Sequence, residues 1–205
     1  MHPSSAFAWT DRAEMLDFVA ERGFGHIFTA TNAGQFVVHA PVLVRGQRLG
    51  FHVAKRNRIA DQLEGRPVLI SVLGREAYHS ANWYVSDNQV PTWHYEAVEI
   101  SGPARRLSGE ELVELLDGLS EAMEKRHSPD KPWSRAKMEP GKFEAMSNAI
   151  VGFEVDAAEM RGTRKFNQHK SADDLKATID GQLGAGREDI VEAIDALVHR
   201  MASQR

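Results

Sequence analysis

Residues 26–45 read HIFTATNAGQFVVHAPVLVR, and this stretch decides the fold class of the chain. Aromatic and β-branched residues fill both of its ends, a composition typical of strands. Between the ends, NAG at 32–34 is a turn signal. The stretch therefore predicts a β-hairpin of strands 26–31 and 35–45. We expect a bulge or a sheet edge at Pro41, because proline has no backbone N–H to donate.

Short strands follow this hairpin, which indicates an antiparallel sheet closing into a barrel rather than alternating α/β units. We predict them over 48–53, 67–73, 77–85, 92–107 and 149–155, with a short helix at 55–64 between the first two. Longer helices are predicted at 11–22, from Ser108 onwards and after residue 171. The expected fold class is α+β, mainly β, with six to seven strands, flanking helices and a helical C-terminal tail.

The composition excludes several classes of function. The 205 residues are 42% hydrophobic and 26% charged, so the chain can bury a core, and the net charge of −4 gives no basic field for nucleic acid. The absence of cysteine excludes disulfides, thiolate nucleophiles and sulfur-ligated metals. No apolar run approaches the roughly 18 residues that would span a membrane. We expect a soluble, cytoplasmic protein without a membrane partner.

The strong nucleotide-binding, hydrolase and zinc motifs are all absent from the sequence. The nine histidines are scattered and no pair has metal-ligand spacing, so no metal site is predicted. They are either separate hydrogen-bonded side chains or include a haem ligand. The basic stretch AKRNR at 54–58 precedes a predicted helix, whose N-terminus suits a phosphate, but it is also a plausible solvated face.

Four aromatic residues, Trp83, Tyr84, Trp93 and Tyr95, lie on two adjacent predicted strands joined by a polar loop. Alternate residues of a strand share a face, so Trp93 and Tyr95 point the same way. Such residues either fill a core or form a flat wall for a ring-shaped ligand or a dimer contact. The pattern alone leaves both interpretations open.

Two segments near these aromatics, SANWY at 80–84 and VPTWHYEAVEISG at 90–102, closely resemble the signature of the PaiB-like FMN-binding negative transcriptional regulators. Further segments resemble the same family in the same order: HAP at 39–41, HVAKRN at 52–57, IVGFEV at 150–155 and KFNQHKS at 165–171. His94 stands where the family has an asparagine. The family belongs to the FMN-binding split barrels, which are related to pyridoxamine-phosphate-oxidase-type proteins.

This resemblance implies a split-barrel homodimer with two FMN sites at the subunit interface. It gives AKRNR the role of holding the flavin phosphate, and it implies that Trp83, Trp93, Lys165 and Gln168 come from the partner chain or close over the ring. The implied cofactor-binding residues are Phe28, Thr29, His39, Ala40, Pro41, Val42, His52, Lys55, Asn57, Arg58, Trp83, Trp93, His94, Lys165 and Gln168. We expect the barrel domain to span 1–170 and a helical extension, 171–205, to pack on the barrel or on the partner subunit.

The resemblance also frames the function. FMN would serve as a redox cofactor or a sensor, and any catalysis would be a flavin-dependent oxidoreduction, because no residue marks itself as a general acid or base. No helix-turn-helix signal appears, so direct DNA binding is not expected and regulation would act through a partner or a metabolite. The alternatives are a haem- or tetrapyrrole-binding split barrel and a regulator that acts without bound flavin.

Overall fold

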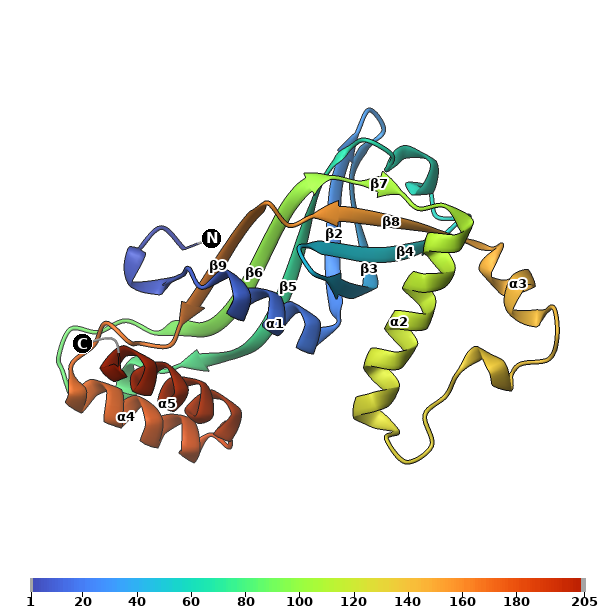
Figure 1. Cartoon of the computed structure of the whole chain (residues 1–205). Helices are drawn as coiled ribbons and strands as arrows, with labels where there is room; N and C mark the ends of the chain where they lie inside the picture. The colour runs from blue at the N-terminus through green and yellow to red at the C-terminus, as the bar shows by residue number, and fades with distance from the viewer. Residues whose placement is uncertain (1, 204–205) are drawn as a thin grey trace. The chain divides into compact units, whose positions relative to one another are not determined.

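The fold is described from a computed structural model, for residues 2–203 of the backbone and for side chains as far as His199. The chain forms two compact units. Unit 1 holds the described residues of segments 1–10, 73–98 and 161–205, and unit 2 holds segments 11–72 and 99–160. Figure 1 shows the elements of both units along the chain.

Nine strands make one antiparallel sheet, in the order β1-β9-β6-β5-β2-β3-β4-β8-β7. Their bounds are β1 Ala8–Trp9, β2 Phe24–Thr31, β3 Gly34–Arg45, β4 Arg48–Ala54, β5 Pro67–His79, β6 Thr92–Pro103, β7 Arg105–Arg106, β8 Ile150–Asp156 and β9 Glu159–Lys165. The sheet does not close, because β1 and β7 lie at its two ends. The expected α+β split-barrel class is confirmed, and the strand number exceeds the expected six or seven because β1, β7 and β9 were not predicted as separate strands.

In the described part of the chain, five α-helices accompany the sheet: α1 Arg12–Arg22, α2 Gly109–His127, α3 Lys142–Ser147, α4 Ala172–Gly184 and α5 Glu188–Ser203. The predicted first helix is confirmed, with the Asp11 side chain accepting from the Glu14 N–H and Gly23 ending the helix at a left-handed φ of 60°. Ser108 and Glu111 form the capping box that begins α2. Among the described residues, no helix is long and apolar enough to cross a membrane.

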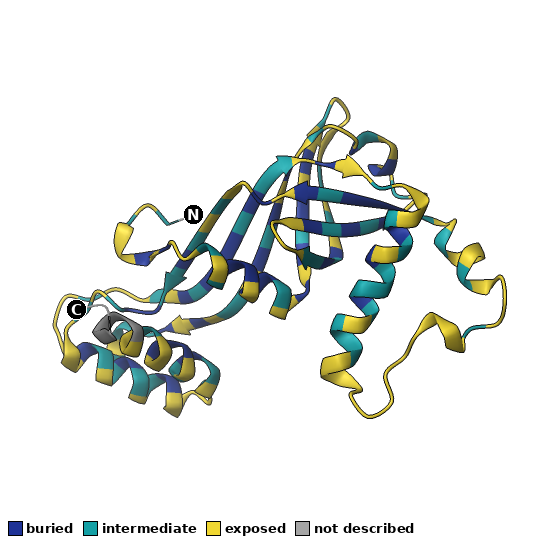
Figure 2. Cartoon of the chain, in the orientation of Figure 1, coloured by how far each residue is buried: buried dark blue, intermediate teal, exposed yellow. Residues whose placement is uncertain are grey.

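Unit 2 buries side chains on both faces of β4 and β8, and one of these faces packs against α2. Buried residues alternate along its strands, as Figure 2 shows, and Phe51 stacks on Phe153 from the neighbouring strand β8 with ring centroids 5.7 Å apart. Leu115 of α2 comes so close to β4 that a Cβ on Gly50 would lie 2.7 Å from its Cδ1 atom. Glycine at this position therefore lets the helix pack directly against the strand.

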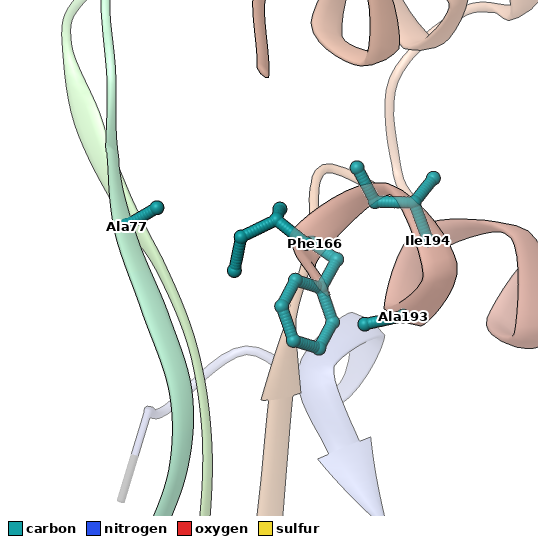
Figure 3. Packing of buried hydrophobic residues seen from close by; sticks show 5 residues of the cluster. Ala77, Phe166, Ala193 and Ile194 are labelled. Carbon is teal, nitrogen blue, oxygen red and sulfur yellow. The ribbon is translucent and has the colours of Figure 1, made fainter. Parts of the chain in front are cut away.

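Unit 1 has its own apolar core, built largely from the C-terminal helices. Ala77 of β5 and Phe166, just after β9, pack with three residues of α5 from the same chain, Ile190, Ala193 and Ile194 (Figure 3). All five side chains are buried. Helix α5 is therefore an integral part of the packing of unit 1.

The hairpin of β2 and β3 is confirmed, with the register running from Phe24 opposite Pro41 to Thr31 opposite Gly34. The strand continues through Pro41, where a bulge or edge was expected. Pro41 is the last residue of β3 that pairs with β2, and from Val42 onwards β3 pairs with β4. The proline thus sits where the strand changes partner.

Three other sequence predictions were wrong. Residues 55–64 contain turns and a three-residue 3-10 helix, Ala60–Gln62, rather than an α-helix. The side chain of Asn57 accepts from the Ile59 N–H at 3.2 Å, a local bond that competes with helix formation. The strands predicted at 67–73 and 77–85 are one strand, β5, which ends at His79. Trp83 and Tyr84 consequently lie in and just after a short 3-10 helix, Ala81–Trp83.

Candidate functional site

The central strands of unit 2 expose a row of apolar side chains. Phe28 of β2 lies directly opposite Val37 of β3 and Leu69 of β5. These three side chains are 42%, 44% and 37% exposed, respectively. Neighbouring strands lie about 4.8 Å apart, so the row is roughly 10 Å long, which suits a flat multi-ring molecule. Exposed apolar residues that line up in this way mark a binding surface more often than isolated ones do.

Two histidines lie beside this row on the same sheet face, because His26 and His39 share the pairing register of β2 and β3. Their Nδ1 atoms are 2.8 Å apart, so one ring donates a hydrogen bond and the other accepts it. Burial and the neighbouring His39 lower the pKa of His26. The 2.8 Å contact therefore places one N–H hydrogen between the two Nδ1 atoms at the edge of the apolar row.

The other predicted residues of β2 and β3 have different positions. Thr29 is buried on the opposite face from Phe28, and its hydroxyl donates to the Pro67 carbonyl at 3.2 Å. Ala40 and Val42 are also buried. The alternation of a strand thus brings Phe28 and His39 to the exposed face and directs Thr29, Ala40 and Val42 inward.

The predicted phosphate-binding residues lie in the turn after β4. Lys55 and Arg58 are exposed, and the Arg58 guanidinium lies 4.5 Å from the centroid of the Phe36 ring. The side-chain oxygen of Asn57 is engaged by the Ile59 N–H. Because no α-helix begins here, a phosphate at this turn would depend on the side-chain cations rather than on a helix dipole.

His52 of β4 is half-buried, and its Nδ1 atom is buried without a hydrogen-bond partner among the described residues. Burial lowers the pKa of the His52 imidazole, so the neutral form is favoured. His52 and Pro41 both contribute to the wall of an apolar cavity.

The remaining predicted residues belong to unit 1. Trp93 is 56% exposed and makes an edge contact with Tyr78, with ring centroids 6.1 Å apart. Trp83 instead packs against α4, where a Cβ on Gly181 would lie 2.4 Å from its ring. Of the two tryptophans, Trp93 is therefore exposed and Trp83 packs inside unit 1.

Lys165 and Gln168 make contacts within unit 1. The Lys165 ammonium donates to the Thr92 hydroxyl at 2.7 Å. The Gln168 amide accepts from the Phe166 N–H at 2.8 Å and donates to the Ala6 carbonyl at 2.9 Å. In this arrangement the Gln168 side chain ties the chain before β1 to the segment after β9.

His94, which replaces the family asparagine, is fully buried in unit 1. It stacks on His79 with ring centroids 4.9 Å apart, and the ring nitrogens of both residues have no hydrogen-bond partner among the described residues. Burial and the neighbouring His79 lower the pKa of His94 to about 3. Burial and Lys170 lower the pKa of His79 to about 4. Both rings are therefore neutral in the folded chain at neutral pH.

Sequence reasoning missed three members of the exposed face: His26, Val37 and Leu69. The pairing register that places them beside Phe28 and His39 joins residues far apart in the sequence. The alternation within strand 35–45 does signal that Val37, His39 and Pro41 share a face, which could have added Val37 to the predicted set.

The comparisons agree with a flavin-binding split barrel. Residues 1–159 match the family model described as "Putative FMN-binding domain". The chain is 30% identical over 192 residues to the Protease synthase and sporulation protein PAI 2 of Bacillus subtilis (strain 168), and the match covers 88% of each chain. The chain belongs to this FMN-binding family, and FMN is the cofactor that the family assigns to it.

Two solved structures share the fold at low sequence identity. The FAD and heme binding protein of Mycobacterium smegmatis superposes with a TM-score of 0.61 at 13% identity, covering 83% of this chain and 78% of its own. The flavocytochrome Anf3 of Azotobacter vinelandii gives a TM-score of 0.55 at 17% identity, with 80% and 72% covered. These likenesses establish the fold.

The buried histidine pair predicts a pH-dependent stability. The folded pKa values of about 3 and about 4 lie below the usual 6.5, so the stabilising effect of the neutral rings is complete above pH 6.5. It is lost as the pH falls from 6.5 towards 4, because the unfolded chain then binds more protons. We predict that urea unfolding will show a loss of up to about 1.4 kcal/mol per pH unit for each histidine in this window.

His94→Asn should remove about half of this pH dependence, while His127→Asn, which changes an exposed histidine, should leave it intact. The slope of the unfolding free energy against pH should differ between these two variants. This difference separates the effect of the buried histidine pair from that of the carboxylates, which titrate in the same pH range. An equal slope for wild type and His94→Asn would contradict the assignment.

Proposed function

We propose that the chain is an FMN-binding homodimer in which the flavin ring lies on the apolar row of Val37, Phe28 and Leu69. The observation that carries this proposal is the exposure of three aligned apolar side chains on adjacent strands, in a chain whose family binds FMN. A flat ring covering this row would remove apolar surface from water, which favours binding by roughly 25 cal/mol per Å² buried.

The flavin phosphate is assigned to Lys55 and Arg58. Both side chains are exposed within one turn of unit 2, and charge-assisted hydrogen bonds from ammonium and guanidinium groups are the strong contacts that a phosphate requires. Asn57 orders the same turn through its bond to the Ile59 N–H.

The second copy of the chain is proposed to cover the flavin ring. The row in unit 2 leaves the outer side of a bound ring open, and unit 1 offers the exposed aromatic pair of Tyr78 and Trp93 as a cover. In a two-fold symmetric dimer, each copy would contribute both surfaces, giving two equivalent sites. Trp93 of one copy would then close over the ring held by the other.

Bound FMN supplies redox chemistry, used in a reaction or as a sensor. The protein contributes an apolar surface that excludes water and a proton held between the Nδ1 atoms of His26 and His39, 2.8 Å apart. Because one of these rings donates and the other accepts, the neutral pair can take up one proton and release it again without placing two charged rings in contact. This pair is therefore the group that would exchange a proton at the ring edge.

A regulatory role is proposed through a metabolite or a protein partner. The related Bacillus subtilis protein is named for protease synthesis and sporulation. The net charge of −4 does not favour direct contact with DNA phosphates, whose binding depends on Lys and Arg. A flavin whose redox state or occupancy changes the exposed face would supply the signal.

Haem binding is the second candidate function. The two structural relatives above are named for flavin together with haem or as a flavocytochrome, and the His26–His39 pair places imidazole nitrogens beside an apolar face. A visible spectrum distinguishes the candidates, since haem gives a Soret band and oxidised flavin gives its own two-banded spectrum. A Soret band from protein supplied with both cofactors would favour haem.

Phe28→Asp tests the proposed ring site. An ionised carboxylate would replace the central apolar contact of the row, and we expect FMN affinity to fall at least tenfold, about 1.4 kcal/mol. Quenching of FMN fluorescence during titration measures the affinity. Leu183→Asp makes the same type of change at an exposed position on α4 and should leave the affinity unchanged. Equal FMN affinity for wild type and Phe28→Asp would contradict the placement of the flavin ring on this face.

The double variant Lys55→Ala with Arg58→Ala tests the phosphate assignment. We expect FMN binding to weaken by more than ~1 kcal/mol, the scale of charge-assisted hydrogen bonds. Riboflavin, which lacks the phosphate, is the matched ligand, and its affinity should be nearly the same for both proteins. Unchanged FMN affinity would contradict the assignment and leave the ring site standing.

A further inference from the structure

A cavity of about 500 Å³ lies in unit 2 between α2, strands β3, β4 and β8, and the segment 128–149, which we call the strap. Leu116, Leu119 and Met123 of α2 line one side, and Trp133 and Phe143 of the strap line the other. Its volume falls within the range of about 300–1,000 Å³ that is typical of small-molecule sites.

Fixed contacts hold the strap beside α2. The backbone N–H of Trp133 donates to the Glu124 carboxylate at 2.7 Å, and Arg135 pairs with Asp117 at 3.2 Å. The Arg135 guanidinium also lies 5.2 Å from the centroid of the Phe143 ring. These contacts orient Trp133 and Phe143 while the space between the strap and the helix remains unfilled by the described side chains.

The polar groups of the cavity are few and uncharged. The described residues that line it include no Asp, Glu, Lys or Arg. The hydroxyls of Ser120 and Ser147 already donate to the carbonyls of Leu116 and Glu144, at 2.9 and 3.0 Å. His52 differs, because its half-buried ring lines the cavity and makes no hydrogen bond within the described part of the chain. Its Nδ1 atom is buried, so Nε2 is the nitrogen that a ligand could reach.

We propose that this cavity binds a neutral, largely apolar aromatic molecule carrying one hydroxyl or carbonyl group that hydrogen-bonds to His52. A neutral molecule fits because no lining charge would compensate the desolvation of an ionised one. Methionine and aromatic side chains accommodate flat apolar ligands of varied outline. Pro41 lies on the same strand face as His39 and also lines the cavity, so this second ligand would bind next to the flavin face. The proposal goes beyond FMN binding and does not require it.

The probe is 2-naphthol, which combines two fused apolar rings with one hydroxyl and is neutral at pH 7. Isothermal titration calorimetry of the full chain, with and without excess FMN, should show saturable binding in both cases. Ser120→Phe and Ser147→Phe each place a ring inside the cavity without removing a bond that another side chain needs, and each should weaken 2-naphthol at least tenfold. Glu110→Phe adds the same ring at an exposed position of α2 and should bind as wild type does.

His52→Leu should weaken 2-naphthol several-fold and leave the affinity for naphthalene, which lacks the hydroxyl, unchanged. Far-UV circular dichroism and the melting temperature verify that each variant is folded, and if one filling variant unfolds, the other decides.

The proposal is overturned if wild type does not bind 2-naphthol, or if a folded filling variant binds it as tightly as wild type. It is also overturned if Phe28→Asp abolishes binding, because the probe would then occupy the flavin face. If wild type binds 2-naphthol but does not bind FMN, the proposed function alone is contradicted.

Discussion

The register of β2 between β3 and β5 is the constraint on which the candidate site depends. It sets Phe28 opposite Val37 and Leu69 and directs the preceding residue, Ile27, into the core. A slip of one residue would exchange these two sets and bury the apolar row. The two-residue turn at 32–33 joins β2 and β3 in this register, and β3 changes partner after Pro41. The candidate binding surface and the core therefore lie on opposite faces of the same paired strands.

The packing of α2 on the sheet determines the second feature of unit 2. Leu112, Leu115 and Leu119 form one buried cluster, and Gly50 and Gly152 allow the helix to approach β4 and β8 closely. Beyond Leu119, α2 comes so close to the end of α1 that a Cβ on Gly23 would lie 2.5 Å from the Cε atom of Met123, and this part of α2 also lines the apolar cavity under the strap. Helix α2 is therefore in close contact at both ends, with β4 and β8 at one and with the end of α1 at the other, and the cavity lies along one side of it.

Unit 1 keeps buried polar groups of a different kind. Glu96 is buried between Arg75 and Arg164, at 3.4 and 3.5 Å, so its charge is compensated. His79 and His94 have no such compensation and remain neutral. An asparagine at 94, as in the related family, would remove one titrating ring from this interior. The replacement therefore affects the pH range in which unit 1 is stable, and it leaves the exposed face of unit 2 untouched.

Much of this fold follows from local chemistry that the sequence displays. The β2–β3 hairpin, both capping motifs and the helical tail were predictable because turn residues, caps and apolar periodicity act over a few residues. The site was predictable only in part. Phe28 and His39 were identified by resemblance to the family. His26 and Leu69 were not, because they lie opposite these two residues only through strand pairing between distant segments of the chain. The false helix at 55–64 had helical spacing, and the Asn57 side chain favoured a turn there instead.

The central claim is that a bound flavin ring lies between two copies of the chain. Sedimentation velocity detected at a visible wavelength of oxidised flavin tests it most directly, because only species that carry the cofactor are seen. The account predicts that the flavin signal sediments with a species of twice the 22.8 kDa chain mass. It also predicts that Trp93→Ala reduces the amount of flavin carried by this species. Flavin that sediments with a single chain would contradict the account.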